Sequence, residues 1–289
     1  MDQAEQLRIM KASRQTRPLA RVITVTSGKG GVGKSNTSIN LAIQFRRQGK
    51  RVVILDADFG LANIEIMFGA VPKHNLYDLI YQGKSIQEII TWGPMNVGFI
   101  SGGSGISGMA NLNREQLSYI IQNLAQLDAI ADIIIVDTGA GIADAVLEFL
   151  VASGEILLVT TPEPTSITDS YSLLKALYRH PKFNEEETKV KLIANRVQKE
   201  EEGEILFHKL NTVVARYLKV PMTFLGSVPQ DAFLSQAVMQ QVPVSLQSPD
   251  AKSSLAYERI AGRLLGAEET KRQPKRGIAA FFSHIISRR

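Results

Sequence analysis

Short runs of aliphatic and β-branched residues alternate with longer stretches of helical periodicity along most of the chain. The run Ile133-Ile134-Ile135-Val136 is apolar at every position, which is typical of a central strand in a parallel sheet covered on both faces. This alternation predicts an α/β fold, a doubly wound and mostly parallel sheet with helices on both faces. The expected strands are Val22–Thr26, Arg51–Asp56, Val97–Ser101, Asp132–Asp137, Ile156–Thr160, Lys189–Ala194 and Thr223–Val228. The expected helices are Lys34–Gln48, Arg114–Asp128, Asp144–Ala152, Ser166–Arg179, Glu201–Leu218, Ala232–Gln240 and Ala251–Leu265.

A glycine-rich segment joins the first expected strand to the first expected helix. Its residues match the G-x-x-x-x-G-K-[ST] pattern of a phosphate-binding loop, in the strand-to-helix context that such a loop requires. Glycines let the backbone N–H groups turn towards a phosphate, and the N-terminus of the helix adds positive potential. We expect Lys34 to reach the β- and γ-phosphates and Ser35 to ligate Mg²⁺. The predicted nucleotide-binding residues here are Gly28, Lys29, Gly30, Gly31, Val32, Gly33, Lys34, Ser35 and Asn36.

Carboxylates follow two of the expected strands. Asp56 and Asp58 stand two residues apart, so their side chains point the same way and can share the water shell of a Mg²⁺ ion. Asp137 ends the apolar run described above and precedes Gly139 and Gly141. An aspartate-rich turn without a metal is the alternative interpretation of the first pair. The phosphate-binding loop upstream favours the magnesium site.

The loop and these carboxylates resemble motifs of the MinD/ParA family of dimeric P-loop ATPases, which belong to the SIMIBI class. The segment K-G-G-V-G-K-S is similar to its deviant Walker A motif, in which the first lysine reaches the partner subunit's nucleotide. The resemblance implies that Lys29 acts in trans and Lys34 in cis, although a lone Lys29 could also be a solvated charge. Asp56–Asn63 is similar to the family's D-x-D-x-G-L-x-N element. In catalysis, the resemblance makes Asp58 the residue that positions the attacking water, with Lys29 and Lys34 beside it. The implied metal site contains Ser35, Asp56 and Asp137, and the implied γ-phosphate switch contains Asp58, Gly60, Asp137, Gly139 and Gly141.

Later segments resemble the family as well. Thr161–Asp169 is similar to a stretch that follows the family's next strand, and Ile193–Val197 and Val228–Asp231 are similar to segments that surround the base. The resemblance implies that Asn195 hydrogen-bonds adenine and Pro229 packs on its face, with Arg196 and Asp231 as further nucleotide-binding residues. An Asn-Arg pair after a strand is also common in simple turns. The implied ligands are ATP and Mg²⁺, and the implied activity is ATP hydrolysis that stays slow until two ATP-bound subunits form a homodimer.

Composition and charge exclude several related functions. The 289 residues contain no cysteine, which rules out iron–sulfur reductases and scaffolds of the same superfamily. The net charge is +5, of which residues 1–21 contribute +3 and residues 270–289 contribute +6, so the intervening residues carry −4. A slightly acidic body argues against nucleic acid as a partner and against a ParA-type DNA-partitioning ATPase. A catalytically silent adaptor would lack Asp58 or Lys34, and both are present.

The basic charge divides the chain into three expected parts: a basic N-terminal extension (1–21), a P-loop ATPase domain (22–267), and a linker with an amphipathic helix (268–289). In the last part, apolar residues recur at helical spacing between basic residues, which favours binding to an anionic membrane. Docking of this helix on its own body is the alternative. The chain has no apolar run of 18 residues and no secretory segment, so we expect a cytoplasmic protein, reversibly peripheral at the inner face of a bacterial membrane. The predicted membrane-binding residues are Ile278, Phe281, Phe282, Ile285 and Ile286.

The start of the chain, Asp2–Arg8, resembles the D-Q-A-x-x-L-R segment of the FlhG (YlxH, FleN) group, MinD-like ATPases that control flagellar number and placement. In that group the segment binds the GTPase FlhF and stimulates its activity, which implies Gln3, Leu7 and Arg8 as partner-binding residues. The same group contacts switch proteins of the flagellar C-ring. The resemblance therefore implies an ATP-dependent switch for flagellar assembly. A division-site regulator of the MinD type is the nearest alternative, but it would begin within a residue or two of its first strand.

Overall fold

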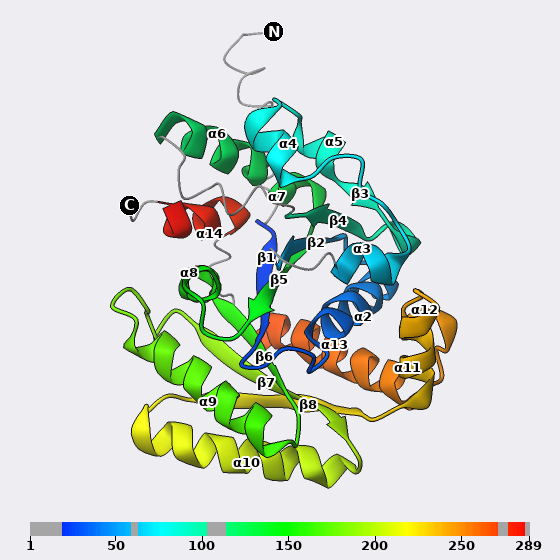
Figure 1. The fold of residues 1–289 in the computed structure, drawn as a ribbon, viewed down its shortest axis with the longest axis vertical. Helices are drawn as coiled ribbons and strands as arrows, with labels where there is room; N and C mark the ends of the chain where they lie inside the picture. The colour runs from blue at the N-terminus through cyan, green and yellow to red at the C-terminus, as the bar shows by residue number, and fades with distance from the viewer. Residues whose placement is uncertain (1–18, 59–62, 103–113, 271–276, 287–289) are drawn as a thin grey trace, which may run out of the picture.

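A computed structural model describes residues 19–58, 63–102, 114–270 and 277–286. One sheet of eight strands runs through the middle of this part of the chain, in the order β3-β4-β2-β5-β1-β6-β7-β8, with helices on both faces (Figure 1). Every neighbouring pair is parallel except β3 and β4. The predicted doubly wound, mostly parallel sheet is therefore confirmed. The strands are β1 (Arg21–Ser27), β2 (Val52–Ala57), β3 (Thr91–Trp92), β4 (Gly98–Ser101), β5 (Ile133–Ala140), β6 (Glu155–Thr160), β7 (Lys189–Val197) and β8 (Met222–Pro229).

The long helices lie close to their predicted positions, and the structure adds short elements in segments whose apolar residues show no sustained helical periodicity. The apolar stripe of Arg114–Asp128 forms two helices, and the last expected helix continues to Thr270, so residues 268–270 of the predicted linker are helical. The sequence patterns did not reveal β3 or the short helices α3, α4, α5 and α12. The helices are α2 (Lys34–Arg47), α3 (Asn63–Phe68), α4 (Leu76–Tyr81), α5 (Ile86–Ile89), α6 (Arg114–Ala125), α7 (Leu127–Ile130), α8 (Asp144–Ala152), α9 (Pro164–Arg179), α10 (Glu200–Tyr217), α11 (Ala232–Met239), α12 (Val244–Gln247), α13 (Lys252–Thr270) and α14 (Gly277–Ile286), with a 3₁₀ turn at Pro94–Asn96.

The middle of the sheet is apolar on both faces, and polar side chains follow at the carboxyl ends of its strands. Residues 133–136 of β5 are buried between β1 and β2, and their side chains enter two separate apolar clusters, one on each face. The register of β2 on β5 places Asp56 directly opposite Asp137 at the carboxyl end of both strands. Parallel strands therefore bring together two carboxylates that are 81 positions apart in the chain.

The C-terminal helix α14 lies against the body, beside α6 and α8 (Figure 1). Ile278, Phe281 and Phe282 are at most 2% exposed, and the rings of Phe281 and Phe282 lie 6.0 and 6.4 Å from the ring of Phe149 on α8. Ile285 packs partly buried against the same cluster. In this structure the apolar face is therefore docked on its own domain, which is the alternative that the sequence left open, and its binding to a membrane stays a prediction.

Three predicted functional sites fall partly or wholly outside the described residues. These are the N-terminal Gln3, Leu7 and Arg8, the switch residue Gly60, and the side chain of Ile286. Within the described ranges, no helix combines the length and the apolar character that a membrane span needs.

Candidate nucleotide and metal site

The phosphate-binding loop connects β1 to α2 and depends on glycine at three positions. Gly31 and Gly33 have φ of 77° and 95°, in the left-handed region that side chains disfavour, and Gly33 immediately precedes α2. Gly28 faces the backbone of α9, where an added Cβ would lie 2.2 Å from the carbonyl carbon of Asp169. The Ser27 hydroxyl donates to the carbonyl of Lys29 at 2.8 Å and braces the start of the loop. The loop therefore has the backbone conformation that the motif predicts.

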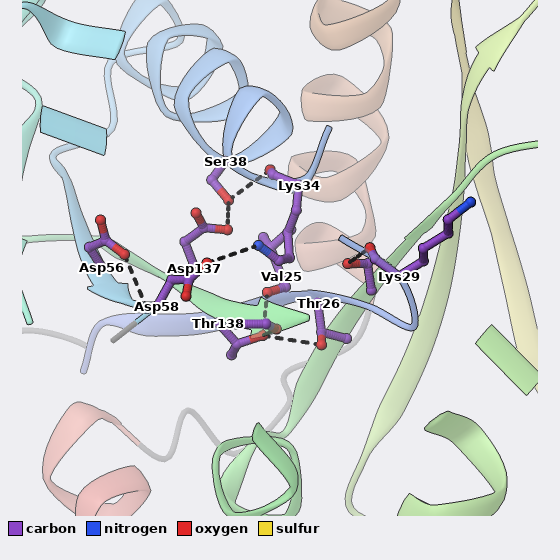
Figure 2. Close-up of polar contacts among 11 residues, drawn as sticks. Val25, Thr26, Lys29, Lys34, Ser38, Asp56, Asp58, Asp137 and Thr138 are labelled. Atoms are coloured by element: carbon purple, nitrogen blue, oxygen red, sulfur yellow. Dashed lines mark hydrogen bonds and ion pairs between the residues drawn. The ribbon is translucent and has the colours of Figure 1, made fainter. Parts of the chain in front are cut away.

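Three carboxylates converge beside this loop at the ends of β2 and β5 (Figure 2). Asp56 and Asp137 are 2% and 0% exposed, and one oxygen of each, Oδ2, has no hydrogen-bond partner among the described residues. The Asp58 backbone N–H donates to Asp56 Oδ1 at 3.1 Å, and the Ser38 hydroxyl donates to Asp137 Oδ1 at 3.0 Å. Lys34 is buried, and its Nζ lies 3.9 Å from Asp58 Oδ2. The predicted Lys34, Asp56, Asp58 and Asp137 thus form one cluster.

The electrostatics of this cluster favour the arrival of a cation. Burial raises the pKa of Asp56 to about 8, and the neighbouring Asp137 adds to the rise. Burial also raises the pKa of Asp137, opposed by the charge of Lys34 and by hydrogen bonds from Ser35 and Ser38. Two adjacent buried carboxylates cannot both ionise without a compensating charge. A divalent ion here would restore both to the ionised form.

The donor set fits Mg²⁺ bound together with a nucleotide. The two unpartnered oxygens, Asp56 Oδ2 and Asp137 Oδ2, and the hydroxyl of Ser35 are hard oxygen donors of the kind that Mg²⁺ prefers. Among the described residues, no group of three or more His, Cys, Asp or Glu side chains forms a complete metal cage. This agrees with the habit of Mg²⁺, which usually takes one or two carboxylates and completes its shell with waters and phosphates.

The second lysine of the loop, Lys29, points away from the carboxylate cluster (Figure 2). Its Nζ lies 3.0 Å from Glu163 Oε2 and 2.9 Å from Thr165 Oγ1, at the start of α9. The Lys29 and Glu163 side chains are 38% and 56% exposed, so this ion pair is at the surface and weak. In this structure Lys29 therefore bonds the start of α9 and not the carboxylate cluster, and its role in trans stays a prediction.

A cavity of about 300 Å³ opens on the other side of the loop. Four of the predicted base-binding residues line it, together with Gly33 and Asn36 of the loop region. Its remaining wall is α11, a helix with a single buried residue, Ala237. Sequence reasoning missed this wall, although an apolar helix directly after the predicted base segment was a usable signal. The lining residues are Gly33, Asn36, Asn195, Arg196, Pro229, Gln230, Asp231, Leu234, Ser235, Val238 and Met239.

Two of the predicted nucleotide-binding residues, Asn195 and Asp231, have structural roles of their own. The Asn195 amide donates to the carbonyl of Val32 at 2.7 Å, and its oxygen accepts from the Arg196 N–H at 2.9 Å, so it braces the phosphate loop. Asp231 accepts from the backbone N–H of Phe233 and from both the N–H and the hydroxyl of Ser253. Burial acts to raise the pKa of Asp231, but these hydrogen bonds hold it below its ordinary value. Both residues shape the cavity, and their contact with a base stays a prediction.

The switch residues that the structure describes lie beside the loop. Gly141 has a φ of 86°, and its N–H donates to the Ser27 carbonyl at 2.9 Å, which ties the end of β5 to the phosphate loop. A Cβ built on Gly139 would lie 3.6 Å from Asp58 Oδ1. Gly139 therefore lies beside the carboxylate cluster and Gly141 is tied to the end of β1, and their action as a switch stays a prediction.

Comparison with known proteins adds sequence and structural relatives. A family model described as ParA, NUBPL iron-transfer P-loop NTPase, matches residues 18–265. The chain is 39% identical over 244 residues to the antiactivator FleN of Pseudomonas aeruginosa, which covers 84% of this chain and 86% of that protein. It is 33% identical over 270 residues to the flagellum site-determining protein YlxH of Helicobacter pylori, covering 92% and 90% respectively. The septum site-determining protein MinD complexed with Mg-ADP, from Pyrococcus horikoshii OT3, has a similar fold. The TM-score is 0.67 at 22% identity, over 88% of this chain and 100% of that one.

Proposed function

Because the chain belongs to the ParA/MinD family of P-loop ATPases, we propose that it is an ATP-dependent dimeric switch that regulates flagellar number or placement. The observation that carries the proposal is the contrast between its two loop lysines. Lys34 is buried beside the carboxylates, whereas the Lys29 side chain is 38% exposed and points away from them. The YlxH relative supports the flagellar part, because its name describes a flagellum site-determining protein.

The chemistry follows from positioning and charge. The loop N–H groups and Lys34 hold the β- and γ-phosphates, and Ser35, Asp56 and Asp137 hold the metal. When bound, Mg²⁺ neutralises charge that develops on the phosphate oxygens. Asp58, whose backbone N–H is fixed by Asp56, orients the attacking water. The second cation that speeds turnover comes from Lys29 of a partner subunit.

Dimerisation makes this enzyme a switch. Lys29 must leave Glu163 and Thr165 to reach a partner's nucleotide, and a surface ion pair of this kind costs only about 0.2–1 kcal/mol to break. The dimer then depends on the γ-phosphate, because the lysine gains a compensating charge only when ATP is bound. Hydrolysis removes that charge, and the subunits separate. Turnover is therefore slow and dependent on dimerisation.

The two basic ends connect the switch to partners. Residues 1–21, with Gln3, Leu7 and Arg8, form the segment that stimulates an FlhF-type GTPase. The helix at residues 277–286 binds an anionic membrane at the cytoplasmic face when it leaves the body, and two helices on a dimer bind more firmly than one. Switch proteins of the flagellar C-ring are further partners by family. In this proposal residues 22–267 are the ATPase domain and the residues on either side are its regulatory appendages.

A MinD-type division-site regulator is the second candidate, since MinD structures share the fold. The description of the family model names iron transfer, but this sequence contains no cysteine that could supply thiolate ligands to an iron–sulfur cluster.

Light scattering of the purified chain with Mg-ATP and with Mg-ADP tests the switch. We expect dimers with ATP alone, loss of dimers without loss of nucleotide binding in Lys29→Ala, and a trapped ATP dimer in Asp58→Ala. ATP-dependent dimers of Lys29→Ala would contradict the trans role. A GTPase assay on FlhF with a peptide of residues 1–21 tests the flagellar part, because no stimulation would favour a generic MinD-like ATPase.

A further inference from the structure

Asp128, at the start of the short helix α7, accepts hydrogen bonds from both ends of the described chain. Its Oδ1 accepts the backbone N–H of Ala20 at 3.2 Å and the backbone N–H of Ile278 at 3.1 Å. Ala20 immediately precedes β1, and Ile278 is in the first turn of α14. One carboxylate oxygen therefore holds the place where the N-terminal extension joins the body and the place where the C-terminal helix begins.

Packing around this carboxylate joins the two ends directly. Gly277 has a φ of 57°, and a Cβ built on it would lie 2.7 Å from Asp128 Oδ2 and 3.2 Å from Leu19 Cβ. Ala20 is fully buried in the same apolar cluster as Ile278, Phe281 and Phe282. Ala20 is thus buried beside the start of α14, Leu19 contacts Gly277 while 45% exposed, and glycine is required for this close approach.

The next residue, Arg21, is fixed independently of α14. Its guanidinium makes a two-pronged ion pair with the buried Glu155, at 2.7 and 2.8 Å, and donates to the carbonyl of Leu264 at 2.8 Å. Its backbone N–H donates to the carbonyl of Asp132 at 2.9 Å. The boundary between the part of the chain that α14 holds and the part that the sheet holds therefore falls between Ala20 and Arg21.

We infer that Asp128 is a shared anchor that couples the two appendages, so that undocking of α14 releases the chain at Leu19 and Ala20 as well. When α14 leaves the body, Asp128 and Ala20 become exposed to water. The backbone N–H of Ala20 is then bonded only to a solvated carboxylate. Coupling of this kind is reciprocal: a ligand that pulls the N-terminal extension away favours undocking of α14 by the same factor. The inference rests on the proposed function only for the identity of the ligands, a GTPase at one end and an anionic membrane at the other.

Hydrogen exchange on the full chain without nucleotide, vesicles or GTPase tests the anchor itself. Asp128→Ala should speed exchange at the Ala20 amide and in α14 by at least about fivefold each, because both lose a partly buried acceptor. Removal of residues 277–289 should speed Ala20 and leave Arg21 slow. The matched control is Asp132→Asn, which removes the same charge four residues away, where the side chain bonds Arg51. Protection of Arg21 shows that each variant is folded.

Unchanged exchange at Ala20 after removal of α14 would overturn the inference, as would an Asp132→Asn variant that releases both ends. A second arm adds vesicles of phosphatidylglycerol and phosphatidylethanolamine to the wild-type chain with Mg-ATP, and we expect faster exchange at Ala20 in the vesicle-bound fraction. Slow exchange at Ala20 in that fraction would overturn the coupling. Absence of a bound fraction would instead contradict the proposed membrane function, which the first arm does not require.

Discussion

Replacing Phe282 by alanine should release α14 from the body without unfolding the domain. Phe282 is fully buried, and truncation of a buried phenylalanine costs about 3–5 kcal/mol when the surrounding structure stays in place. The helix, however, is a ten-residue segment that follows the last helix of the domain and is held by a few apolar side chains and the anchor at Asp128. We expect its net docking free energy to be only about 1 kcal/mol, because ordering ten residues offsets most of the gain from burying the apolar face. The variant therefore escapes the full cost by undocking, and the loss of global stability is limited to the docking free energy.

A phenylalanine inside the sheet provides the comparison. Phe99, on β4, is equally buried, but no local undocking can relieve the cavity that alanine would leave there. At about 2–4 °C per kcal/mol for a domain of this size, Phe99→Ala should lower Tm by roughly 10 °C. Phe282→Ala should lower it by less than about 5 °C, since the body remains intact.

Hydrogen exchange and thermal unfolding of the two variants decide the matter. We expect α14 amides to lose protection in Phe282→Ala, while amides of β5 keep theirs. The variant should also bind anionic vesicles without ATP, because its remaining apolar residues are already exposed. If α14 stays protected and Tm falls as far as in Phe99→Ala, the helix is an integral part of the core and the reasoning is refuted.

Three further predictions concern the nucleotide site. Burial raises the pKa of Asp56 from 3.8 to about 8, so between these pH values the folded, metal-free protein holds a proton on Asp56 that the unfolded chain has lost. The free energy of unfolding should therefore fall as the pH rises towards 8. In thermal unfolding, Asp56→Asn should make Tm less dependent on pH over this range. Gly28→Ala places a Cβ 2.2 Å from the Asp169 carbonyl carbon, and calorimetry should show Mg-ATP binding weakened at least about tenfold. Glu163→Gln removes a half-exposed ion pair to Lys29 in each subunit, about fivefold per pair, so light scattering should show ATP-dependent dimers at a concentration lower by at most about thirtyfold, and a larger change would give Glu163 another role.

The sequence predicted the elements that have a strong local signal. The uninterrupted apolar run at 133–136 predicted a central strand, and the glycine pattern at 28–33 predicted a phosphate-binding loop, in which Gly31 and Gly33 have positive φ values. The carboxylate cluster followed from these two, because adjacent parallel strands bring Asp56 and Asp137 to one edge. The short helices α3, α4 and α5 were missed because four to six residues span too few turns to show a period.

Contacts between distant segments were beyond prediction for a different reason. Asn195 was expected at the base, but whether its amide turns to a base or to the carbonyl of Val32 depends on the distance between β7 and the loop. Asp128 carried no motif at all, and its role depends on two backbone N–H groups that the fold brings from opposite ends of the chain. The type and spacing of side chains show which hydrogen bonds a residue can form. Which partner it bonds depends on the groups that the fold places beside it.

The tail helix shows the limit most clearly. The spacing of Ile278, Phe281, Phe282 and Ile285 established that one face would be buried, and a membrane and the protein's own body satisfy that requirement equally well. The surface on which this face docks is formed by α6, α7, α8 and β1. No sequence pattern links these four segments to the tail or to one another. Because the hydrophobic effect is non-directional, the amphipathic pattern cannot choose between the two environments. For the same reason, one apolar face can bind either the body or a membrane, provided that its docking free energy on the body is small enough for a membrane to compete. The choice therefore depends on the few contacts that a membrane cannot reproduce, above all the hydrogen bond from Ile278 to Asp128.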